Sequence, residues 1–318
     1  MKRLMNMTTS YHDLPRYADN ADLKQGYGQF GLDGLELMVY GEDERGIVAA
    51  DDVVGSHLRY FHHWVPVWRR DEPAMLAEYG DLAAVESAIG GRDAQALVQA
   101  FRENMGLLLP YAPEYAVMHV SDVTLRGCIT REHPLSDAQV IAAQIELANA
   151  VFDDSDWHAA VLFENLWWPG MTMINPDLVY ELLAGVSYPN CGVMLDIGHL
   201  LHTNLELRSR EEGIDYIYQV LSRYDNLDFI KGVHLHQTLS GAYSQNVMAR
   251  PFEVRGSYME RALAVQQHVL RVDSHQPFIS PRVLELIEYI DPQYLVLELI
   301  TSNREQHEHL LARQMQVL

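Results

Sequence analysis

The sequence contains little cysteine, with only Cys128 and Cys191 among its 318 residues. Two cysteines cannot build a disulfide framework or a four-cysteine zinc site, and they fit a reducing compartment. Cys191 comes before a predicted strand rather than after one, and Cys128 has no base beside it in the sequence. We therefore interpret both as core residues.

Long apolar runs are also absent. No stretch approaches the roughly 20 apolar residues that are needed to cross a bilayer. The basic residues at the start of the chain are not followed by the apolar segment of a signal peptide. We therefore expect a cytoplasmic protein that has no contact with a membrane.

Positive charge is scarce. The chain has 23 Lys and Arg residues against 44 Asp and Glu residues, which gives a net charge of −21. This acidic balance argues against a broad nucleic-acid footprint. The composition, 48% hydrophobic and 21% charged, is otherwise that of a folded protein, and it excludes disorder and low-complexity filaments.

Short apolar runs alternate with helical stretches along the whole chain. Their continuous rather than alternating apolar character indicates a parallel sheet that is buried on both faces. An eighth candidate strand, residues 269–273, is ambiguous with helix. The seven clear strands are predicted at residues 35–39, 53–58, 116–120, 160–164, 192–196, 230–236 and 295–300.

Strand–helix alternation leaves either a doubly wound sheet or a barrel. Eight strands favour the (β/α)8 TIM barrel, which typically takes roughly 250 residues. No linker rich in Gly, Pro or Ser divides the chain, so residues 1–318 are predicted to form one domain. The long connections 59–114 and 237–272 are predicted as insertions after the second and sixth strands counted along the sequence, at the active-site mouth. A closing C-terminal helix is expected to leave His307 and His309 in solvent.

Acidic and histidine side chains stand at the ends of the predicted strands. In a barrel these ends meet at one rim, where catalytic groups come together. One histidine at such a position is more often a core residue, but buried carboxylates are costly unless they are paired or bound to a metal. The set therefore predicts a site for zinc, manganese, cobalt, magnesium or iron. Its members are His57, His119, Glu164, Asp196, His199, His234, His236 and Glu298.

These residues lie in segments that resemble the xylose isomerase-like TIM barrels, also called the AP endonuclease family 2 group. The family includes sugar isomerases, sugar and sugar-phosphate epimerases, inosose dehydratases and endonuclease IV. The resemblance implies a metal core of Glu164, Asp196, His234 and Glu298, with His199 nearby and His236 as a reserve ligand. The matching segments cover nearly the whole chain and are FGLDGLEL near the start, FEN at Glu164, LDIGH at Asp196, KGVHLH at His234 and LEL at Glu298.

Endonuclease IV has further ligands and holds three zinc ions. The resemblance assigns the additional positions to His57, to His119 and to an Asp-x-His pair, Asp273 and His275. The alternative for this pair is a loop of surface polar groups at the end of a helix. Iron-dependent oxidases that modify peptide cysteines resemble the same ligand pattern. The predicted centre therefore holds one to three divalent ions.

Six residues near these strand ends are predicted to bind substrate. Arg59 could hold an anion, and two tryptophans that follow the strand ending at Glu164 could wall the pocket. Asn165 is expected to orient Glu164 or to contact substrate. The full set is Arg59, Asn165, Trp167, Trp168, His236 and Gln237.

Three functions remain open. In the first, isomerisation or epimerisation of a small sugar, polyol or sugar phosphate, Glu164 and Glu298 take and return a proton beside the metal, with help from His199. The second is phosphoester hydrolysis with two or three ions, as endonuclease IV implies. The third is iron-dependent oxidation of a peptide. We predict the first, with a small polyhydroxylated or phosphorylated substrate and no nucleic-acid partner, and the sequence leaves homo-oligomer formation open.

Overall fold

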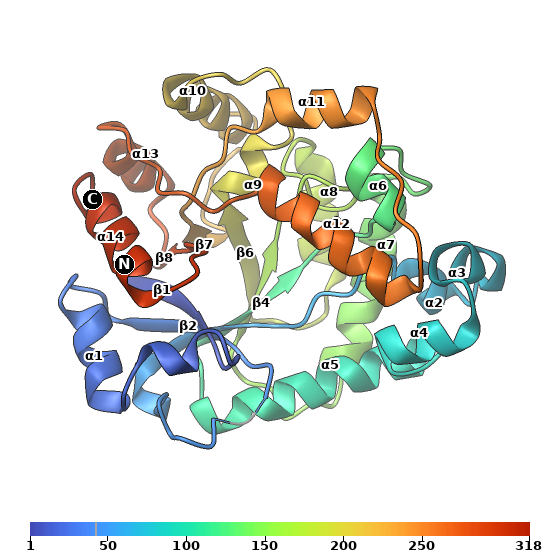
Figure 1. Cartoon of the computed structure of the whole chain (residues 1–318), viewed down its shortest axis with the longest axis horizontal. Helices are drawn as coiled ribbons and strands as arrows, with labels where there is room; N and C mark the ends of the chain where they lie inside the picture. Colours follow the sequence, from blue (N-terminus) through green and yellow to red (C-terminus); the bar gives the residue numbers. More distant parts are fainter. Residues whose placement is uncertain (42) are drawn as a thin grey trace.

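The computed structural model describes residues 1–41 and 43–318, and its central element is a closed barrel of parallel strands (Figure 1). Each strand pairs with the next one in the sequence, and the last strand pairs with the first. This confirms the predicted (β/α)8 barrel. The strands are β1 (Lys2–Thr8), β2 (Gly34–Met38), β3 (Val53–His57), β4 (Tyr115–His119), β5 (Ala160–Glu164), β6 (Cys191–Asp196), β7 (Ile230–His234) and β8 (Tyr294–Leu297).

The observed set of strands differs from the predicted set in two places. The sequence prediction missed β1, which pairs with both β2 and β8. Its sequence, KRLMNMT, starts with two basic residues and mixes buried with half-exposed positions, so it lacks the continuous apolar run of the other strands. Residues 269–273, the candidate eighth strand, instead lie at the end of a helix. Val265, His268 and Val272 repeat at helical spacing on the buried face of that helix.

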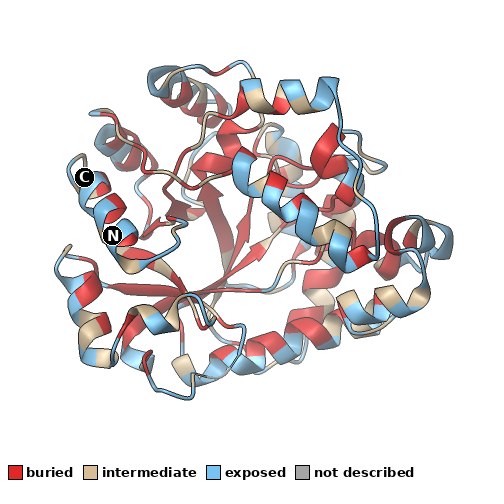
Figure 2. Cartoon of the chain, viewed as in Figure 1, coloured by how far each residue is buried: buried red, intermediate tan, exposed pale blue. Residues whose placement is uncertain are grey.

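Helices surround the barrel, and Figure 2 shows that they turn buried faces inward and exposed faces outward. Aspartates begin several of them: the side chains of Asp19, Asp81 and Asp93 each accept a backbone N–H of the first turn. Among the described residues, no helix combines the length and the apolar character that crossing a bilayer requires. The helices are α1 (Asn20–Gly28), α2 (Val65–Arg69), α3 (Glu72–Tyr79), α4 (Leu82–Ile89), α5 (Ala94–Leu108), α6 (Leu125–Thr130), α7 (Asp137–Phe152), α8 (Pro176–Gly185), α9 (Ile197–Leu201), α10 (Arg210–Leu221), α11 (Gly241–Ala249), α12 (Tyr258–Val272), α13 (Val283–Ile290) and α14 (Arg304–Met315).

The apolar core has two layers. The larger layer lies between the strands and the surrounding helices. The smaller one fills the barrel itself, where Gly55 makes room for Tyr115, because a Cβ atom at residue 55 would overlap the tyrosine ring. The polar side chains at the strand ends therefore lie above a packed apolar layer. Its members are Leu4, Val54, Tyr115, Val117, Leu162, Met194, Tyr294 and Val296.

Two long connections follow β3 and β7. The first carries α2 to α5, and the second carries α11 to α13. Both insertions were predicted, but the missed β1 shifts the count: they follow the third and seventh strands, not the second and sixth. In the second insertion, α12 packs beside α6 at the carboxyl end of the barrel (Figure 1).

The C-terminal helix α14 departs from the sequence expectation at one histidine. His309 is exposed, as expected, but His307 is only 3% exposed because it shares a buried face with Leu310 and Leu311. Burial lowers the pKa of His307 to about 4, and the positive charge of Arg16 adds to the shift. His307 is therefore held in its neutral form.

Replacing His307 should make the free energy of unfolding depend less on pH between about pH 6.5 and 4.5. Its folded pKa lies below the unfolded value of about 6.5. Its neutral form therefore contributes its full stability above pH 6.5, and this contribution is lost as the pH falls toward 4. We expect wild type to lose about 2 kcal/mol more than His307→Gln between pH 6.5 and 4.5. Urea unfolding at both pH values measures this difference. His309→Gln is the matched control and should behave like wild type, and equal losses in all three proteins would contradict the prediction.

Candidate metal centre

The carboxyl ends of the strands bring the predicted acidic and histidine residues together at one rim. Five consecutive strands, β3 to β7, end in one of these residues, and Glu298 directly follows β8. Parallel strands in a barrel end on the same side, so the side chains converge. The donor atoms form three groups, and within each group all donors lie within 4.8 Å of one another. The first group is His57, His119 and Glu164; the second is Glu164, Asp196, His234 and Glu298; the third is His199, His236, Asp273 and His275.

Glu164 joins the first group to the second. Its Oε2 atom lies 3.0 Å from His57 Nε2 and 3.2 Å from His119 Nε2. Its Oε1 atom lies 3.3 Å from His234 Nδ1 and 3.2 Å from His199 Nδ1. Each oxygen of this buried carboxylate therefore faces a different set of imidazoles, as in a carboxylate that bridges two ions.

One nitrogen in the second group faces more carboxylates than it can bond. His234 Nδ1 lies 3.2 Å from Glu298 Oε2, 3.3 Å from Glu164 Oε1 and 3.6 Å from Asp196 Oδ2. An imidazole nitrogen carries at most one proton, so it can donate to only one of these three oxygens. A divalent ion among the four donors would satisfy all of them at once, and the oxygen and nitrogen donors suit such an ion.

Unpartnered polar atoms support the same interpretation. Within the described part of the chain, Glu298 Oε2, His119 Nδ1 and His236 Nδ1 are buried and have no hydrogen-bond partner. Leaving a polar atom buried without a partner costs about 1–3 kcal/mol. Each group thus contains, beside its satisfied donors, an atom that a bound ion or a ligand of that ion would satisfy. The residues present fit a set of metal ions.

Backbone carbonyls orient three of the imidazoles. The Nδ1 atoms of His57 and His199 lie 2.9 Å from the carbonyl oxygens of Leu58 and Asn165. In the same way, His275 Nδ1 lies 3.2 Å from the carbonyl oxygen of Glu298. A carbonyl only accepts, so in each ring Nδ1 carries the proton and Nε2 is left to bind an ion. Such partners fix the ring orientation of metal-binding histidines.

The third group includes the Asp-x-His pair for which the sequence left two interpretations. Asp273 and His275 are 4% and 7% exposed, so the alternative of a surface loop is wrong. Asp273 Oδ2 lies 2.9 Å from His275 Nε2 and 3.2 Å from His199 Nε2. His275 adopts a left-handed backbone conformation, with φ +45°, and its ring stacks on that of His236 at 3.8 Å. Strained backbone of this kind is concentrated at functional sites.

His236, which was predicted both as a reserve ligand and as a substrate-binding residue, belongs to the third group. Its Nε2 atom lies 2.9 Å from Asp196 Oδ2, which links the third group to the second. Gly198 makes this position available, because a Cβ atom at residue 198 would overlap the His236 ring. The glycine of the LDIGH segment is thus a steric requirement of the site.

Substituting Gly198 by alanine should displace His236 and weaken the third group. The ring is buried and is stacked on His275, so it cannot move away freely. We expect Gly198→Ala to lose one ion per chain, or to bind it about 100-fold more weakly, as happens when the support of a ligand is removed. Elemental analysis after dialysis against graded chelator measures this. Gly106→Ala on α5 is the control, because nothing lies within 4 Å of a Cβ atom there. Unchanged ion content in Gly198→Ala would contradict the prediction.

Sequence reasoning missed two supporting residues. Glu36, on β2, lies 3.0 Å from His234 Nε2 and accepts a hydrogen bond from the Tyr115 hydroxyl. His202, on the turn after α9, lies 3.1 Å from Asp273 Oδ1. A glutamate in the middle of a buried strand was a signal for Glu36. His202 had no such signal, because its partner lies 71 residues away in the sequence.

The carboxylates of the site raise the pKa values of several of its histidines, whereas burial lowers the pKa of His119 to about 3. Burial by itself lowers the pKa of His275, but the carboxylates of Asp273 and Glu298 raise it to about 9. Burial likewise opposes protonation of His234, yet Glu36 and Glu298 hold its pKa well above the usual value. Without ions, protonated imidazoles would therefore supply the positive charge that the carboxylates require.

The predicted substrate residues take different positions. Asn165 is fully buried, and its amide bonds the backbone N–H and the backbone carbonyl of Asp196, each at 2.9 Å. Both ends of its amide thus tie β5 to β6, and its role toward Glu164 or a substrate stays a prediction. The exposed Arg59 places its guanidinium 5.9 Å from the centre of the Phe61 ring, outside the three groups.

Trp167 and Gln237 lie next to the centre. The Trp167 ring is 5.1 Å from that of His199 and also contacts Trp168, at 4.4 Å. Both tryptophans are buried. Gln237 pairs through its backbone with Gln276, and its Oε1 atom is buried without a partner. Their roles toward a substrate stay predictions.

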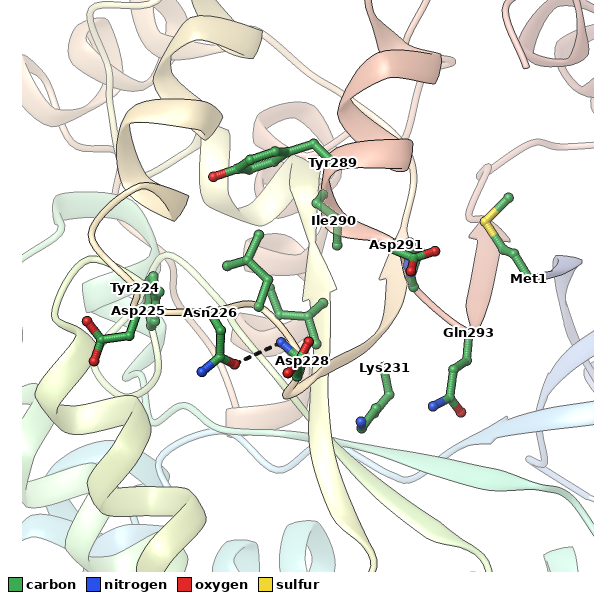
Figure 3. A pocket seen from close by; sticks show the side chains of 13 residues that line it. Met1, Tyr224, Asp225, Asn226, Asp228, Lys231, Tyr289, Ile290, Asp291 and Gln293 are labelled. Carbon is green, nitrogen blue, oxygen red and sulfur yellow. Dashed lines mark hydrogen bonds between the residues drawn. The ribbon is translucent and has the colours of Figure 1, made fainter.

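Pockets lie at both ends of the barrel. Figure 3 shows one of about 640 Å3 whose lining includes Lys231 of β7 and Gln293, the residue before β8. This is the amino end of the strands, and none of the three groups found among the described residues lies there. A pocket of about 720 Å3 lies at the other end, beside Glu298, where Leu299 and Ile300 line it. Barrel enzymes place their chemistry at the carboxyl end, so we assign the functional site there.

Solved structures with a similar fold were found by structural comparison. A D-tagatose 3-epimerase-like protein matches with a TM-score of 0.52 at 12% identity, covering 100% of this chain and 98% of that one. The chain has the fold of the xylose isomerase-like TIM barrels. The probable 3-DHS dehydratase AsbF of Bacillus anthracis (TM-score 0.47, 13% identity, 100% and 98% covered) and endonuclease IV of Thermus thermophilus (0.45, 11%, 100% and 100%) also match. No protein-family model and no curated protein sequence matches the chain. At these identities, the likeness to this xylose isomerase-like group concerns the fold alone.

Proposed function

We propose that the chain is a phosphoester hydrolase that works with two or three divalent ions at the carboxyl end of its barrel. The observation that carries this proposal is the position of Glu164, whose two oxygens face two separate ligand groups. Hydrolytic sites with two metals hold their ions about 4 Å apart, a spacing that a shared carboxylate supports. An isomerase with one ion would have no use for the first and third groups.

Ions held by these groups would activate a water molecule and neutralise the charge that develops on the leaving oxygen. The chain supplies the proton acceptor and the orientation. Glu298 Oε2, which has no hydrogen-bond partner among the described residues, is placed to accept the proton of the attacking water. The water oxygen then bonds to phosphorus, and the bond from phosphorus to the leaving oxygen breaks. The leaving oxygen takes up a proton from solvent as it departs, and Glu298 returns its proton to solvent.

Isomerisation or epimerisation, the function predicted first from the sequence, remains the second candidate. The second group alone supplies four donors for one ion, and Glu164 and Glu298 are both members of it. The third group distinguishes the two candidate functions, because only the hydrolase would need it. A double variant, Asp273→Asn with His275→Gln, should lower hydrolysis strongly but leave an isomerase with one ion active.

Metal content and two substrates test the proposal. Protein purified without chelator should hold two or three zinc or manganese ions per chain by elemental analysis. It should release p-nitrophenol from bis(p-nitrophenyl) phosphate, and chelator should stop this release. One ion per chain, together with epimerisation of a ketohexose, would replace the proposal by the second candidate. Two or three iron ions without hydrolysis would indicate oxidative chemistry instead.

A further inference from the structure

Helix α12 lines two pockets at the carboxyl end of the barrel. The pocket beside Glu298, of about 720 Å3, includes Gln266 and Leu270 of α12. A second pocket, of about 370 Å3, includes Met259, Leu263 and again Gln266. Gln266 belongs to both, so the two pockets are neighbours along the helix, and we call them together the α12 groove. From residue 259 to residue 270 the helix rises about 16 Å.

The α12 groove lies beside two accessible ligands of the metal centre. Most ligands of the centre are buried, but the side chains of Glu298 and His119 are 17% and 15% exposed. Leu299, next to Glu298, lines the first pocket. Tyr60, whose ring lies 5.1 Å from that of His119, lines the second. Each pocket thus includes a neighbour of one accessible ligand, so a molecule lying along α12 would come close to the centre.

The walls of the α12 groove contain exposed apolar and aromatic side chains, which lie among polar ones in the larger pocket. On α12, Met259, Leu263 and Leu270 are exposed at spacings of four and seven residues, which places them on one helix face. Opposite them, Tyr11, Tyr40 and Ile300 are exposed in the loops that follow β1, β2 and β8. Large apolar side chains that gather around a pocket in this way can contact the apolar part of a ligand.

The groove offers little to a polyanion. Among the described residues that line its two pockets, Arg16 is the one Lys or Arg side chain. It forms an ion pair with Asp13 and donates hydrogen bonds to Thr301. The chain as a whole carries a net charge of −21. A nucleic-acid strand needs several free cations along its backbone, so it does not fit this groove.

We propose that the substrate is a small phosphodiester that carries a bulky apolar or aromatic group, which lies in the α12 groove while the phosphate sits over the metal centre. This inference rests on the proposed function and names its substrate class. One phosphate charge would be met by the centre, and the apolar group by the helix and the two tyrosines. A bare sugar phosphate would leave the apolar walls unused.

Two esters with the same leaving group test the substrate class. The zinc-loaded protein should hydrolyse phenyl p-nitrophenyl phosphate with a KM at least tenfold lower than that for methyl p-nitrophenyl phosphate. As a readout besides activity, calorimetry should show diphenyl phosphate binding at least tenfold more tightly than dimethyl phosphate. Equal values for both pairs would overturn the inference. Neither hydrolysis nor binding of any of the four, with the ions present, would overturn the proposed function itself.

Substitutions of exposed residues on α12 test whether the substrate binds in the α12 groove. Leu263→Glu and Leu270→Glu should each raise the KM for the phenyl ester at least fivefold and raise that for the methyl ester by a smaller factor. Because both side chains are exposed, folding should not suffer. Leu107→Glu, at an exposed leucine on α5 outside the groove, is the matched control and should behave like wild type. If the two α12 variants also behave like wild type while hydrolysis persists, the α12 groove is not the binding site and the hydrolase proposal stands.

Discussion

Glu164→Gln is expected to remove two ions from the zinc-loaded protein and to lower phosphodiester hydrolysis by about 1,000-fold. The reason is the double contact of this carboxylate, whose oxygens face the first and second groups separately. An amide has nearly the same shape but carries no charge, and it presents one oxygen and one NH2 group. Neither group would keep its full set of anionic donors.

The matched variant is Asp273→Asn in the third group. Asp273 contacts His199 and His275 in the third group, whereas Glu164 belongs to the other two groups, so this variant should lose only one ion. Elemental analysis and p-nitrophenol release measure both variants. Circular dichroism should show that each is folded. Loss of the same number of ions from both would contradict the separate roles assigned to the two carboxylates.

Much of this centre could be predicted from the sequence because the barrel imposes its own geometry. A residue at the carboxyl end of a parallel strand lies on the catalytic rim wherever that strand stands in the chain. His57, Glu164 and His234 were therefore found from strand ends alone. Asp273 and His275 lie between α12 and α13, on no strand, so the resemblance to a family suggested them and only the structure placed them.

The features that escaped prediction depend on contacts between distant segments. Gly198 is required because the ring of His236, 38 residues later in the sequence, lies against it. The amide of Asn165 bonds the backbone of Asp196, 31 residues later in the sequence, at the end of β6. The first strand, β1, was missed because its pairing with β8 joins the two ends of the chain. None of these contacts leaves a local pattern of hydrophobicity or spacing.

Removing the ions should lower the melting temperature by at least about 10 °C. Glu164, Asp196, Asp273 and Glu298 converge in a site where, in the metal-free protein, only imidazoles can offset their charge. Each ion present at 100 times its dissociation constant stabilises the fold by about 2.7 kcal/mol. For a domain of this size, each kcal/mol shifts the melting temperature by about 2–4 °C. Two or three such ions therefore account for the expected shift.

Thermal unfolding followed by circular dichroism, before and after dialysis against chelator, measures this shift. Readdition of zinc should restore the original melting temperature, which separates metal loss from damage during dialysis. Glu164→Gln should show a much smaller difference, because it has already lost two of the groups that bind ions. An identical melting temperature with and without ions would mean that the imidazoles alone satisfy the carboxylates. The unpartnered Glu298 Oε2 argues against that outcome, because it shows that the donors are not all satisfied by one another.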